Sequence, residues 1–281
     1  MKVLYDKENR RLVYAGQNAS PDFWNSHWET ENLKESIKRG KESRLILRTL
    51  KKYIPDKKGR ILDGGCGNGQ VVYCMHAHGY EGVGVDFAEK TIRRVNEIFP
   101  ELDVESGDVR NLQFPDDHFV GYWSLGVIEH FLDGYIDILK EMRRVLVNRG
   151  CLFLSFPSMS YLRRLKEKMG FYQKFTSRRR GGFYQFVLSP DTVIRNLKAN
   201  GFELIEKRPL SGLKGFKDEV SLFKPLLQKL HDYKGQSFWT NGFRFVLDNL
   251  LASFAGHMTL LVLRNNKELR RAECHRTPKS V

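Results

Sequence analysis

The sequence predicts an α/β fold in which a doubly wound, mostly parallel β-sheet is covered by helices on both faces. Apolar, strand-like runs alternate with amphipathic helical segments along much of the chain. The run at 60–64 leads directly into a glycine-rich turn, and the run at 82–86 ends in an acid. Buried parallel strands separated by amphipathic helices are typical of this class, because the crossover helices cover both faces of the sheet.

The alternation is regular from residue 60 onward. We expect strands at 60–64, 82–86, 102–106, 119–125, 150–156, 202–208 and 256–263, and helices at 69–78, 88–98, 133–147 and 190–200. A helical pattern over 31–53 precedes them, and Gly40 favours its division into two helices. Right-handed crossovers would bring the loops after the first four strands to one edge of the sheet, where ligands bind in such folds.

The remaining stretches divide the chain into expected regions. Residues 1–29 contain an aromatic cluster and are interpreted as a lid segment. The main domain is expected over 30–264, with partly helical cap insertions at 157–187 and 209–256. The polar, basic tail at 265–281 is expected to fray.

The glycine-rich turn is the strongest local signal. Residues 61–69 have the sequence Ile-Leu-Asp-Gly-Gly-Cys-Gly-Asn-Gly. Gly65, Gly67 and Gly69 remove side chains where the backbone must approach a ligand and where a positive φ is needed. Because backbone amides at a helix start carry a partial positive charge, the turn predicts a nucleotide-like cofactor.

Two acids at later strand ends narrow the choice of cofactor. Asp86 ends the second strand, where a carboxylate commonly binds a ribose diol. Asp108 follows the third strand and could accept a hydrogen bond from the amino group of an adenine. A nicotinamide- or flavin-binding domain is the main rival. Its fingerprint is Gly-x-Gly-x-x-Gly, however, whereas this loop has the tighter Gly-x-Gly-x-Gly.

Four motifs in order make the chain similar to class I S-adenosylmethionine-dependent methyltransferases, in the type-11-like, small-molecule branch. They are residues 61–70, Asp86, Gly107-Asp108, and 122–131. The resemblance implies a seven-stranded Rossmann-like sheet, an antiparallel strand inserted beside its edge, and S-adenosyl-L-methionine as cofactor.

The resemblance also implies site residues. The expected cofactor-binding set is Asp63, Gly64, Gly65, Gly67, Asn68, Gly69, Asp86, Phe87, Asp108, Val109, Leu125 and Gly126. His130, after the fourth strand, is the first candidate for a general base, with a structural role as the alternative. His27, in the aromatic cluster, is the second. No metal is expected: Cys74 and His78 could share a helix face, but two ligands are too few for zinc.

The net charge of +14 favours anionic partners: nucleic acid, an anionic lipid surface or a phosphorylated substrate. The alternative is that the positive charge serves only to keep the protein soluble. Between 163 and 180 eight basic residues are interleaved with apolar ones, a pattern that suits an anionic membrane face or RNA, or a merely solvated surface. No base-stacking RNA module is recognisable, so RNA is the less favoured partner.

The resemblance implies O-methylation of a small-molecule, sugar or lipid-linked acceptor. The segment from Phe183 to Met258 is similar to methyltransferases of bacterial polysaccharide, lipid and natural-product pathways. An RNA methyltransferase and a non-catalytic cofactor-binding module are the alternatives. The absence of a signal peptide or an apolar run of about 18 residues, with unpaired cysteine spacing, predicts a cytoplasmic protein, and a position at the membrane periphery is compatible with this prediction.

Overall fold

The fold is known from a computed structural model. It describes residues 1–29, 32–175, 182–220, 224–225, 227–228 and 238–268. The chain divides into two compact units. Unit 1 comprises Met1–Asn18, Ser155–Val193 and Lys207–Leu261. Unit 2 comprises Ala19–Leu154, Ile194–Glu206 and Val262–Val281.

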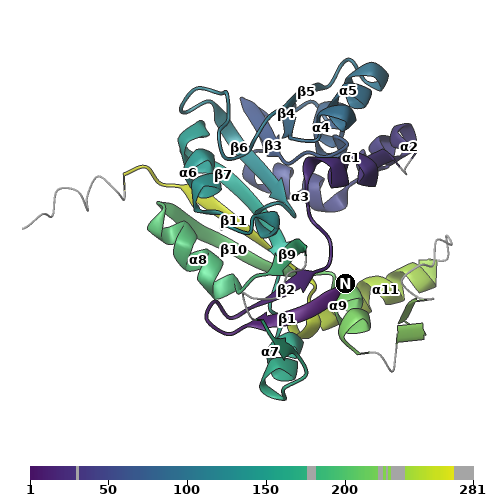
Figure 1. The fold of residues 1–281 in the computed structure, drawn as a ribbon. Coiled ribbons are helices and arrows are strands. Elements are labelled where there is room, and N and C mark those ends of the chain that lie inside the picture. The colour runs from purple at the N-terminus through teal and green to yellow at the C-terminus, as the bar shows by residue number, and fades with distance from the viewer. Residues whose placement is uncertain (30–31, 176–181, 221–223, 226, 229–237, 269–281) are drawn as a thin grey trace, which may run out of the picture. The chain divides into compact units, whose positions relative to one another are not determined.

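A seven-stranded sheet has the order β10-β11-β7-β6-β3-β4-β5 (Figure 1). Its strands are β3 (Arg60–Gly64), β4 (Glu81–Asp86), β5 (Asp103–Ser106), β6 (Phe119–Leu125), β7 (Leu146–Pro157), β10 (Phe202–Leu210) and β11 (Met258–Asn265). The central strands are parallel, with Leu62 opposite Val83 on one side and Tyr122 on the other. The predicted α/β class, with a mostly parallel sheet and one antiparallel edge, is confirmed.

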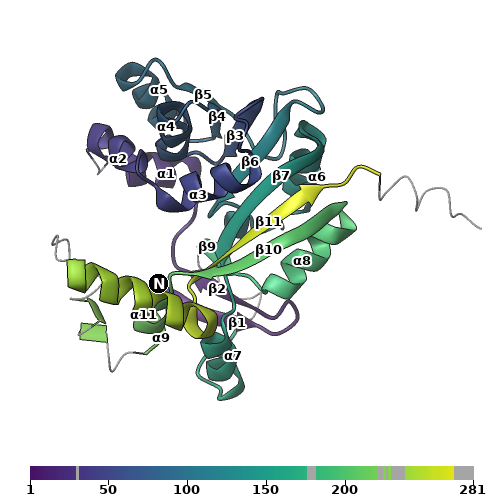
Figure 2. The ribbon, with the colours of Figure 1, turned by 180° about the vertical axis from the view of Figure 1, so that it is seen from behind.

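Helices of unit 2 follow the predicted alternation. They include α1 (Pro21–Glu29), α2 (Leu33–Gly40), α3 (Arg44–Tyr53), α4 (Gln70–Ala77), α5 (Glu89–Ile98) and α6 (Ile136–Val145), with a short 3-10 turn at Ile128–His130. In Figure 2, α4 and α5 lie beside β4 and β5, which they contact. The core includes Trp123 of β6, whose ring stacks on Phe153 of β7 with centroids 4.3 Å apart.

Two helix boundaries have clear local causes. The expected helix over 31–53 is divided after Gly40, as predicted. A Cβ at Gly40 would lie 2.6 Å from the Gln70 carbonyl oxygen, so the glycine allows α2 to end against the start of α4. The helix predicted from 133 starts only at Ile136, because Gly134 has a φ of +101° that an α-helix cannot accommodate.

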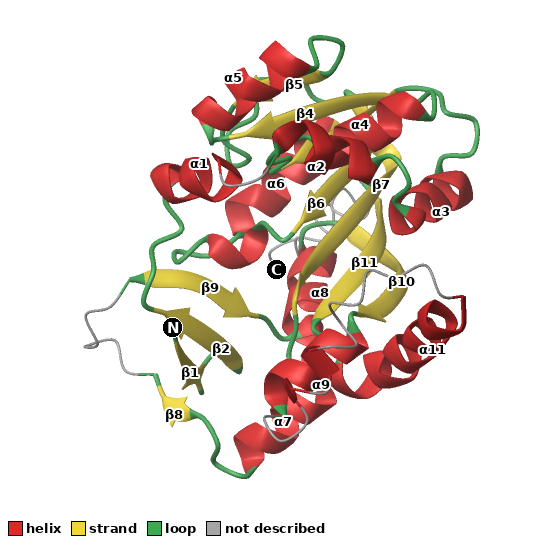
Figure 3. Cartoon of the chain, turned by 90° about the vertical axis from the view of Figure 1, so that its right-hand side faces the viewer, coloured by secondary structure: helices red, strands yellow, loops and turns green. Residues whose placement is uncertain are grey.

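Unit 1 contains a second, four-stranded sheet of order β8-β1-β2-β9, of which β1, β2 and β9 are prominent in Figure 3. The strands are β1 (Lys2–Asp6), β2 (Arg11–Ala15), β8 (Gln173–Lys174) and β9 (Phe183–Val187). Its helices are α7 (Tyr161–Lys168), α9 (Gly212–Glu219) and α11 (Phe238–Ala255), and α8 (Pro190–Ala199) begins in unit 1 and ends in unit 2.

Residues 1–29, which the sequence predicts to be a lid segment, are divided between the two units. Residues 2–15 form a hairpin in unit 1, whereas α1 belongs to unit 2. The hairpin forms because Leu4 and Leu12 are buried and Asp6 accepts hydrogen bonds across the turn, including one of 2.9 Å from Arg11. Among the described residues, no helix is both long and apolar enough to cross a membrane.

Candidate functional site

A cavity of about 390 Å³ opens in unit 2 at the carboxyl ends of β3, β4, β5 and β6. Each of these strands, or the loop that follows it, contributes to the wall, and α1 contributes two tryptophans. Carboxyl ends of parallel strands are where α/β sheets bind ligands, because loops converge there without blocking the strands. The cavity lies at the edge that the sequence predicts.

The glycine loop after β3 forms one wall of the cavity. Gly65, Gly67 and Gly69 have φ values of +83°, +53° and +77°, which favour glycine. A Cβ at Gly67 would lie 2.7 Å from the Trp28 ring, and one at Gly65 would collide with Val127. The loop is thus glycine-rich both to turn and to keep its backbone at the cavity surface.

Asp86, at the end of β4, holds this loop in place. Its two carboxylate oxygens accept hydrogen bonds from the amides of Gly67 (2.8 Å) and Ala88 (2.9 Å). Burial raises the pKa of Asp86, and these amide bonds oppose the rise. Because a carboxylate offers about four acceptor positions, it can still accept hydrogen bonds from a ligand at the cavity surface.

Asp63 lies behind the loop and is not part of the cavity wall. Asp63 is 2% exposed to solvent. Burial, with a smaller contribution from the charge of Asp86, raises the pKa of Asp63 to about 8. At neutral pH the carboxyl group is therefore mainly protonated, and a nearby cation would favour its ionisation.

Asp108, after β5, is paired with Arg110. The guanidinium donates to both carboxylate oxygens, with distances of 2.6 to 3.0 Å, and also lies 5.2 Å from the centre of the Phe131 ring. The hydrogen bonds from Arg110 hold the pKa of Asp108 below its usual range. Both side chains line the cavity, so an adenine that bonded Asp108 would share it with Arg110.

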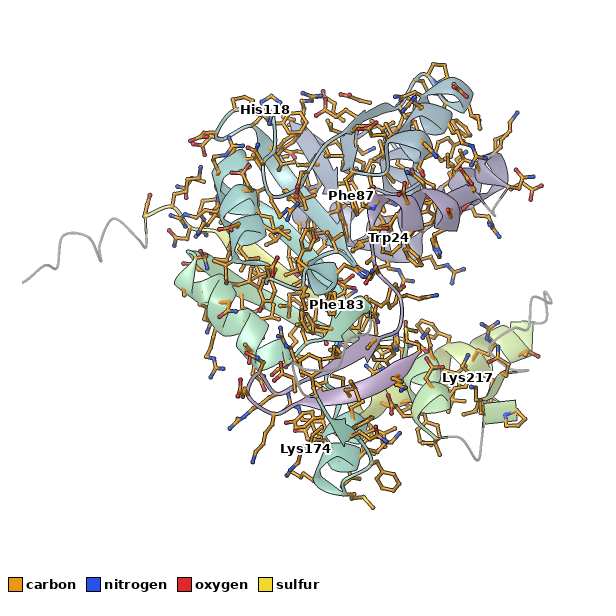
Figure 4. All side chains as sticks on the ribbon, in the orientation of Figure 1. Trp24, Phe87, His118, Lys174, Phe183 and Lys217 are labelled. Atoms are coloured by element: carbon orange, nitrogen blue, oxygen red, sulfur yellow. The ribbon has the colours of Figure 1, made fainter. Side chains whose placement is uncertain are left out.

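Two further wall residues are His130, in the 3-10 turn after β6, and Trp24, on α1. Their ring centroids are 4.9 Å apart in an edge-to-face arrangement, and both residues line the cavity. Figure 4 labels Trp24 and Phe87, two aromatic residues that line the cavity. Next to His130, Glu129 is 1% exposed, and burial raises its pKa to about 8.

The structure brings nine of the fourteen predicted site residues to the cavity. They are Gly65, Gly67, Asp86, Phe87, Asp108, Val109, Leu125, Gly126 and His130. The other five are not part of the wall: Asp63, Gly64, Asn68, Gly69 and His27. The Asn68 amide donates to the Ser36 hydroxyl at 2.9 Å, which ties the loop to α2. His27 is exposed on α1 and packs against its tryptophans.

Several wall residues were not predicted. Arg110, Phe131, Asp133 and Asp137 lie within 30 residues of Asp108 in sequence and line the cavity. The only available signal for Arg110 was its position two residues after Asp108. Asp133 and Asp137 follow the β6 loop without any recognisable spacing, so the sequence offered no signal for them.

The cavity is acidic although the chain is strongly basic. Four aspartates line it, Asp86, Asp108, Asp133 and Asp137. Among the described residues that line the cavity, Arg110 is the one lysine or arginine, and it is paired with Asp108. The site-bearing stretch 19–154 has 19 Lys and Arg against 21 Asp and Glu, within a chain of net charge +14. Such a cavity suits a cationic ligand better than a pyrophosphate.

Comparison with known proteins agrees with this geometry. The family model described as a methyltransferase domain matches residues 62–154. A probable S-adenosylmethionine-dependent methyltransferase from Mycolicibacterium smegmatis is 29% identical over 98 residues, which are 35% of this chain and 38% of that protein. A demethylmenaquinone methyltransferase from Lysinibacillus sphaericus is 28% identical over 131 residues, 44% of this chain and 56% of that protein. These matches span less than two thirds of either relative.

Solved structures show the same fold at low identity. The [4+2]-cyclase SpnF has a TM-score of 0.56 and 16% identity, covering 90% of this chain and 98% of that one. The PH0226 protein from Pyrococcus horikoshii has a TM-score of 0.50 and 18% identity, covering 86% and 99%. The family match, the relatives and the order of the motifs show that residues 62–154 form an S-adenosylmethionine-dependent methyltransferase domain, and the solved structures show that the fold is the one found in this class.

Proposed function

We propose that this chain transfers the methyl group of S-adenosylmethionine to an oxygen atom of a small-molecule, sugar or lipid-linked acceptor. The observation that carries the proposal is the acidic cavity beside the glycine loop, lined mostly by residues of the matched segment 62–154. S-adenosylmethionine carries a sulfonium and an ammonium against one carboxylate, so its net charge is positive. An acidic wall in a basic chain is the electrostatic complement of that cofactor.

The residues present fit the cofactor. Asp86 would bind the ribose hydroxyls with its remaining acceptor positions. Gly65 and Gly67 would bring the loop backbone against the methionine portion, and Asp108 with Val109 would hold the adenine. Because Arg110 already donates to Asp108, it would fix the direction in which that carboxylate points.

Two further predicted residues would act around the sulfonium. Leu125 and Gly126 line the cavity at the end of β6 and would lie beneath it. Asp63 lies behind the loop, so it would act through its charge on the amino group of the cofactor or by orienting the loop. Asn68 and Gly69 would support the loop from α2 and α4.

Methyl transfer requires mainly alignment from the protein. When bound, S-adenosylmethionine supplies an electrophilic methyl group on a positively charged sulfur. The wall formed by Trp24, Trp28 and Phe131 would exclude water and hold the acceptor oxygen in line. Such alignment can supply much of the acceleration of a two-substrate reaction.

His130 is the proposed general base. A hydroxyl acceptor gains nucleophilicity when its proton is removed, and an imidazole ordinarily titrates near neutral pH. His130 lines the cavity, whereas the second candidate, His27, is exposed and outside the wall. The geometry therefore favours His130 as the base.

The distribution of charge weighs against RNA as the acceptor. A phosphate backbone binds to clustered basic side chains, but the cavity wall contains four aspartates and one paired arginine. A small-molecule acceptor is also in keeping with the name of one relative, the demethylmenaquinone methyltransferase. Peripheral association with a membrane would suit a lipid-linked acceptor.

Transfer of labelled methyl to fractionated cell extract tests the proposal. The label is expected in the lipid, glycan or small-molecule fraction, and Asp86→Ala should abolish it. Label in RNA or in protein would overturn the acceptor class. Cofactor binding without label in any fraction would support a non-catalytic module, an outcome that the shared fold of a [4+2]-cyclase makes worth testing.

A further inference from the structure

The positive charge of the chain is concentrated in unit 1. Unit 1 contains 20 Lys and Arg against 8 Asp and Glu, whereas unit 2 contains 27 against 25. Nearly all of the net charge of +14 therefore lies outside the unit that holds the cavity. A charge surplus of this size attracts anionic partners to unit 1 and not to the methyltransferase site.

Unit 1 also exposes an uncharged apolar stripe on α11. Phe243, Val246, Leu250 and Phe254 are 60%, 54%, 72% and 42% exposed. Their spacing of three, four and four residues places them on one face of the helix. Among the described side chains of α11, the other exposed residues of that face are Gly242, Asn249 and Ser253, and none of them is charged. Exposed apolar patches of this kind mark interaction sites.

The opposite face of α11 packs against α9. A Cβ on Gly212 would collide with the backbone near Ala252, and one on Gly215 would collide with the Ala255 carbonyl group. The two helices are therefore close enough for backbone contact. The Asp248 carboxylate also accepts a 2.9 Å hydrogen bond from the Leu213 amide. This packing fixes which face of α11 is turned away from α9, and the apolar stripe lies on that face.

A second helix of unit 1, α7, contacts α11 and has a similar character. Tyr161, Leu165 and Met169 recur every four residues and are 69%, 48% and 63% exposed. Exposed lysines, Lys168 and Lys174, lie close to them in sequence. Apolar side chains flanked by lysines are typical of surfaces that enter the headgroup region of a membrane.

We infer that the α11 stripe, defined as Phe243, Val246, Leu250 and Phe254, docks unit 1 on an anionic lipid bilayer surface. The apolar side chains would enter the boundary between headgroups and acyl chains, while the basic residues of unit 1 are attracted by anionic headgroups. The inference goes beyond methyl transfer, because it concerns a surface on which no proposed catalytic residue lies.

The charge distribution favours a membrane over the other occupants. A second copy docked through the same stripe would bring two strongly basic units together, which electrostatic repulsion opposes. RNA would bind basic side chains, but the uncharged stripe offers nothing to phosphates. An anionic bilayer satisfies both the apolar stripe and the charge of the unit around it.

Flotation with lipid vesicles tests the inference on the full chain. The wild-type protein is expected to float with vesicles of phosphatidylcholine and phosphatidylglycerol and to bind phosphatidylcholine alone much more weakly. The double variant Leu250→Gln/Phe254→Gln keeps the net charge and should lower partitioning by about tenfold. The matched control Ile98→Gln/Ile205→Gln changes two exposed apolar residues of unit 2 and should leave it unchanged.

Each other outcome would overturn the inference. Failure of the wild-type chain to float, or equal flotation of the α11 variant, would show that the stripe does not contact lipid. A wild-type dimer that the α11 variant converts to a monomer would identify a second copy as the occupant, and loss of RNA binding in that variant would identify RNA. Retained affinity for S-adenosylmethionine in both variants separates this test from the proposed enzymatic activity.

Discussion

The two units differ in net charge and in the kinds of side chain that they expose. Unit 2 has nearly balanced charge and gathers its acids around one cavity, whereas unit 1 is strongly basic and exposes apolar residues. The polar groups of unit 2 face the proposed cofactor, while the most buried charges of unit 1 face one another. The difference agrees with the division of labour proposed above, in which methyl transfer takes place in unit 2 and unit 1 recognises a membrane surface.

The largest expected effect tests the buried charges of unit 1. Arg163 is 1% exposed and donates a 2.8 Å hydrogen bond to Glu219, which also accepts from Lys166 and Tyr172. Burial alone would raise the pKa of Glu219, but the charge of Arg163 and these hydrogen bonds hold it below its usual range. Arg163→Ala should therefore lower the free energy of unfolding by about 3–5 kcal/mol, measured by urea denaturation.

The neighbouring residue supplies the control. Arg164 pairs with Asp191 at 3.0 Å, but both side chains are largely solvated. Arg164→Ala should change the free energy of unfolding by less than about 1 kcal/mol. Equal losses in the two variants would contradict the distinction between a buried network and a solvated surface.

In unit 2 the comparable test is Asp86→Ala. The variant should weaken S-adenosylmethionine binding by about 2–4 kcal/mol, because the ribose hydroxyls lose a charged acceptor and the Gly67 amide loses its partner. Calorimetric titration measures this loss. The control variant Glu105→Ala removes an exposed acid from the adjacent strand and should bind S-adenosylmethionine with unchanged affinity. Unchanged affinity in Asp86→Ala would refute its role.

His130→Ala separates chemistry from binding in the same cavity. Turnover should fall by about 100-fold or more if His130 removes the acceptor proton. Cofactor affinity should stay within about twofold, because a general base acts on the acceptor and not on the cofactor. His27→Ala is the control from α1 and should retain activity. Full activity of the His130 variant would assign it a packing role against Trp24.

The smallest effect concerns the pH dependence of cofactor binding. Because the pKa of Asp63 is about 8 in the free protein, the group is mainly protonated at pH 7. A bound cation would favour its ionised form and lower its pKa, so affinity should rise with pH toward 8, by at most about tenfold per unit. The rise should be absent in Asp63→Asn. Parallel pH profiles for the two proteins would show that Asp63 does not titrate on binding.

The sequence predicted unit 2 better than unit 1 for a physical reason. Gly65, Gly67 and Asp86 lie in short motifs whose spacing is fixed by one strand, one turn and one helix, so their meeting could be predicted locally. The pairing of β2 with β9 joins Leu12 to Val187, and no local pattern records such a contact. For the same reason residues 1–18 could not be assigned to the same unit as 183–187.

Some features of the site could not be predicted from local sequence patterns either. The bond between Asp108 and Arg110 depends on side-chain rotamers, which spacing does not determine. Asp133 and Asp137 reach the cavity because Gly134 turns the chain before α6. The expected tail at 265–281 falls mostly outside the described residues. Its first residue, Asn265, is buried and donates to the Leu146 carbonyl at 2.9 Å.

The most direct measurement is calorimetric titration of the full chain with S-adenosylmethionine. We expect saturable binding of one molecule per chain, and no binding of NAD⁺, whose pyrophosphate the four aspartates of the cavity would repel. Absence of heat at millimolar S-adenosylmethionine, with the chain folded, would contradict the assignment of this cavity as a cofactor site.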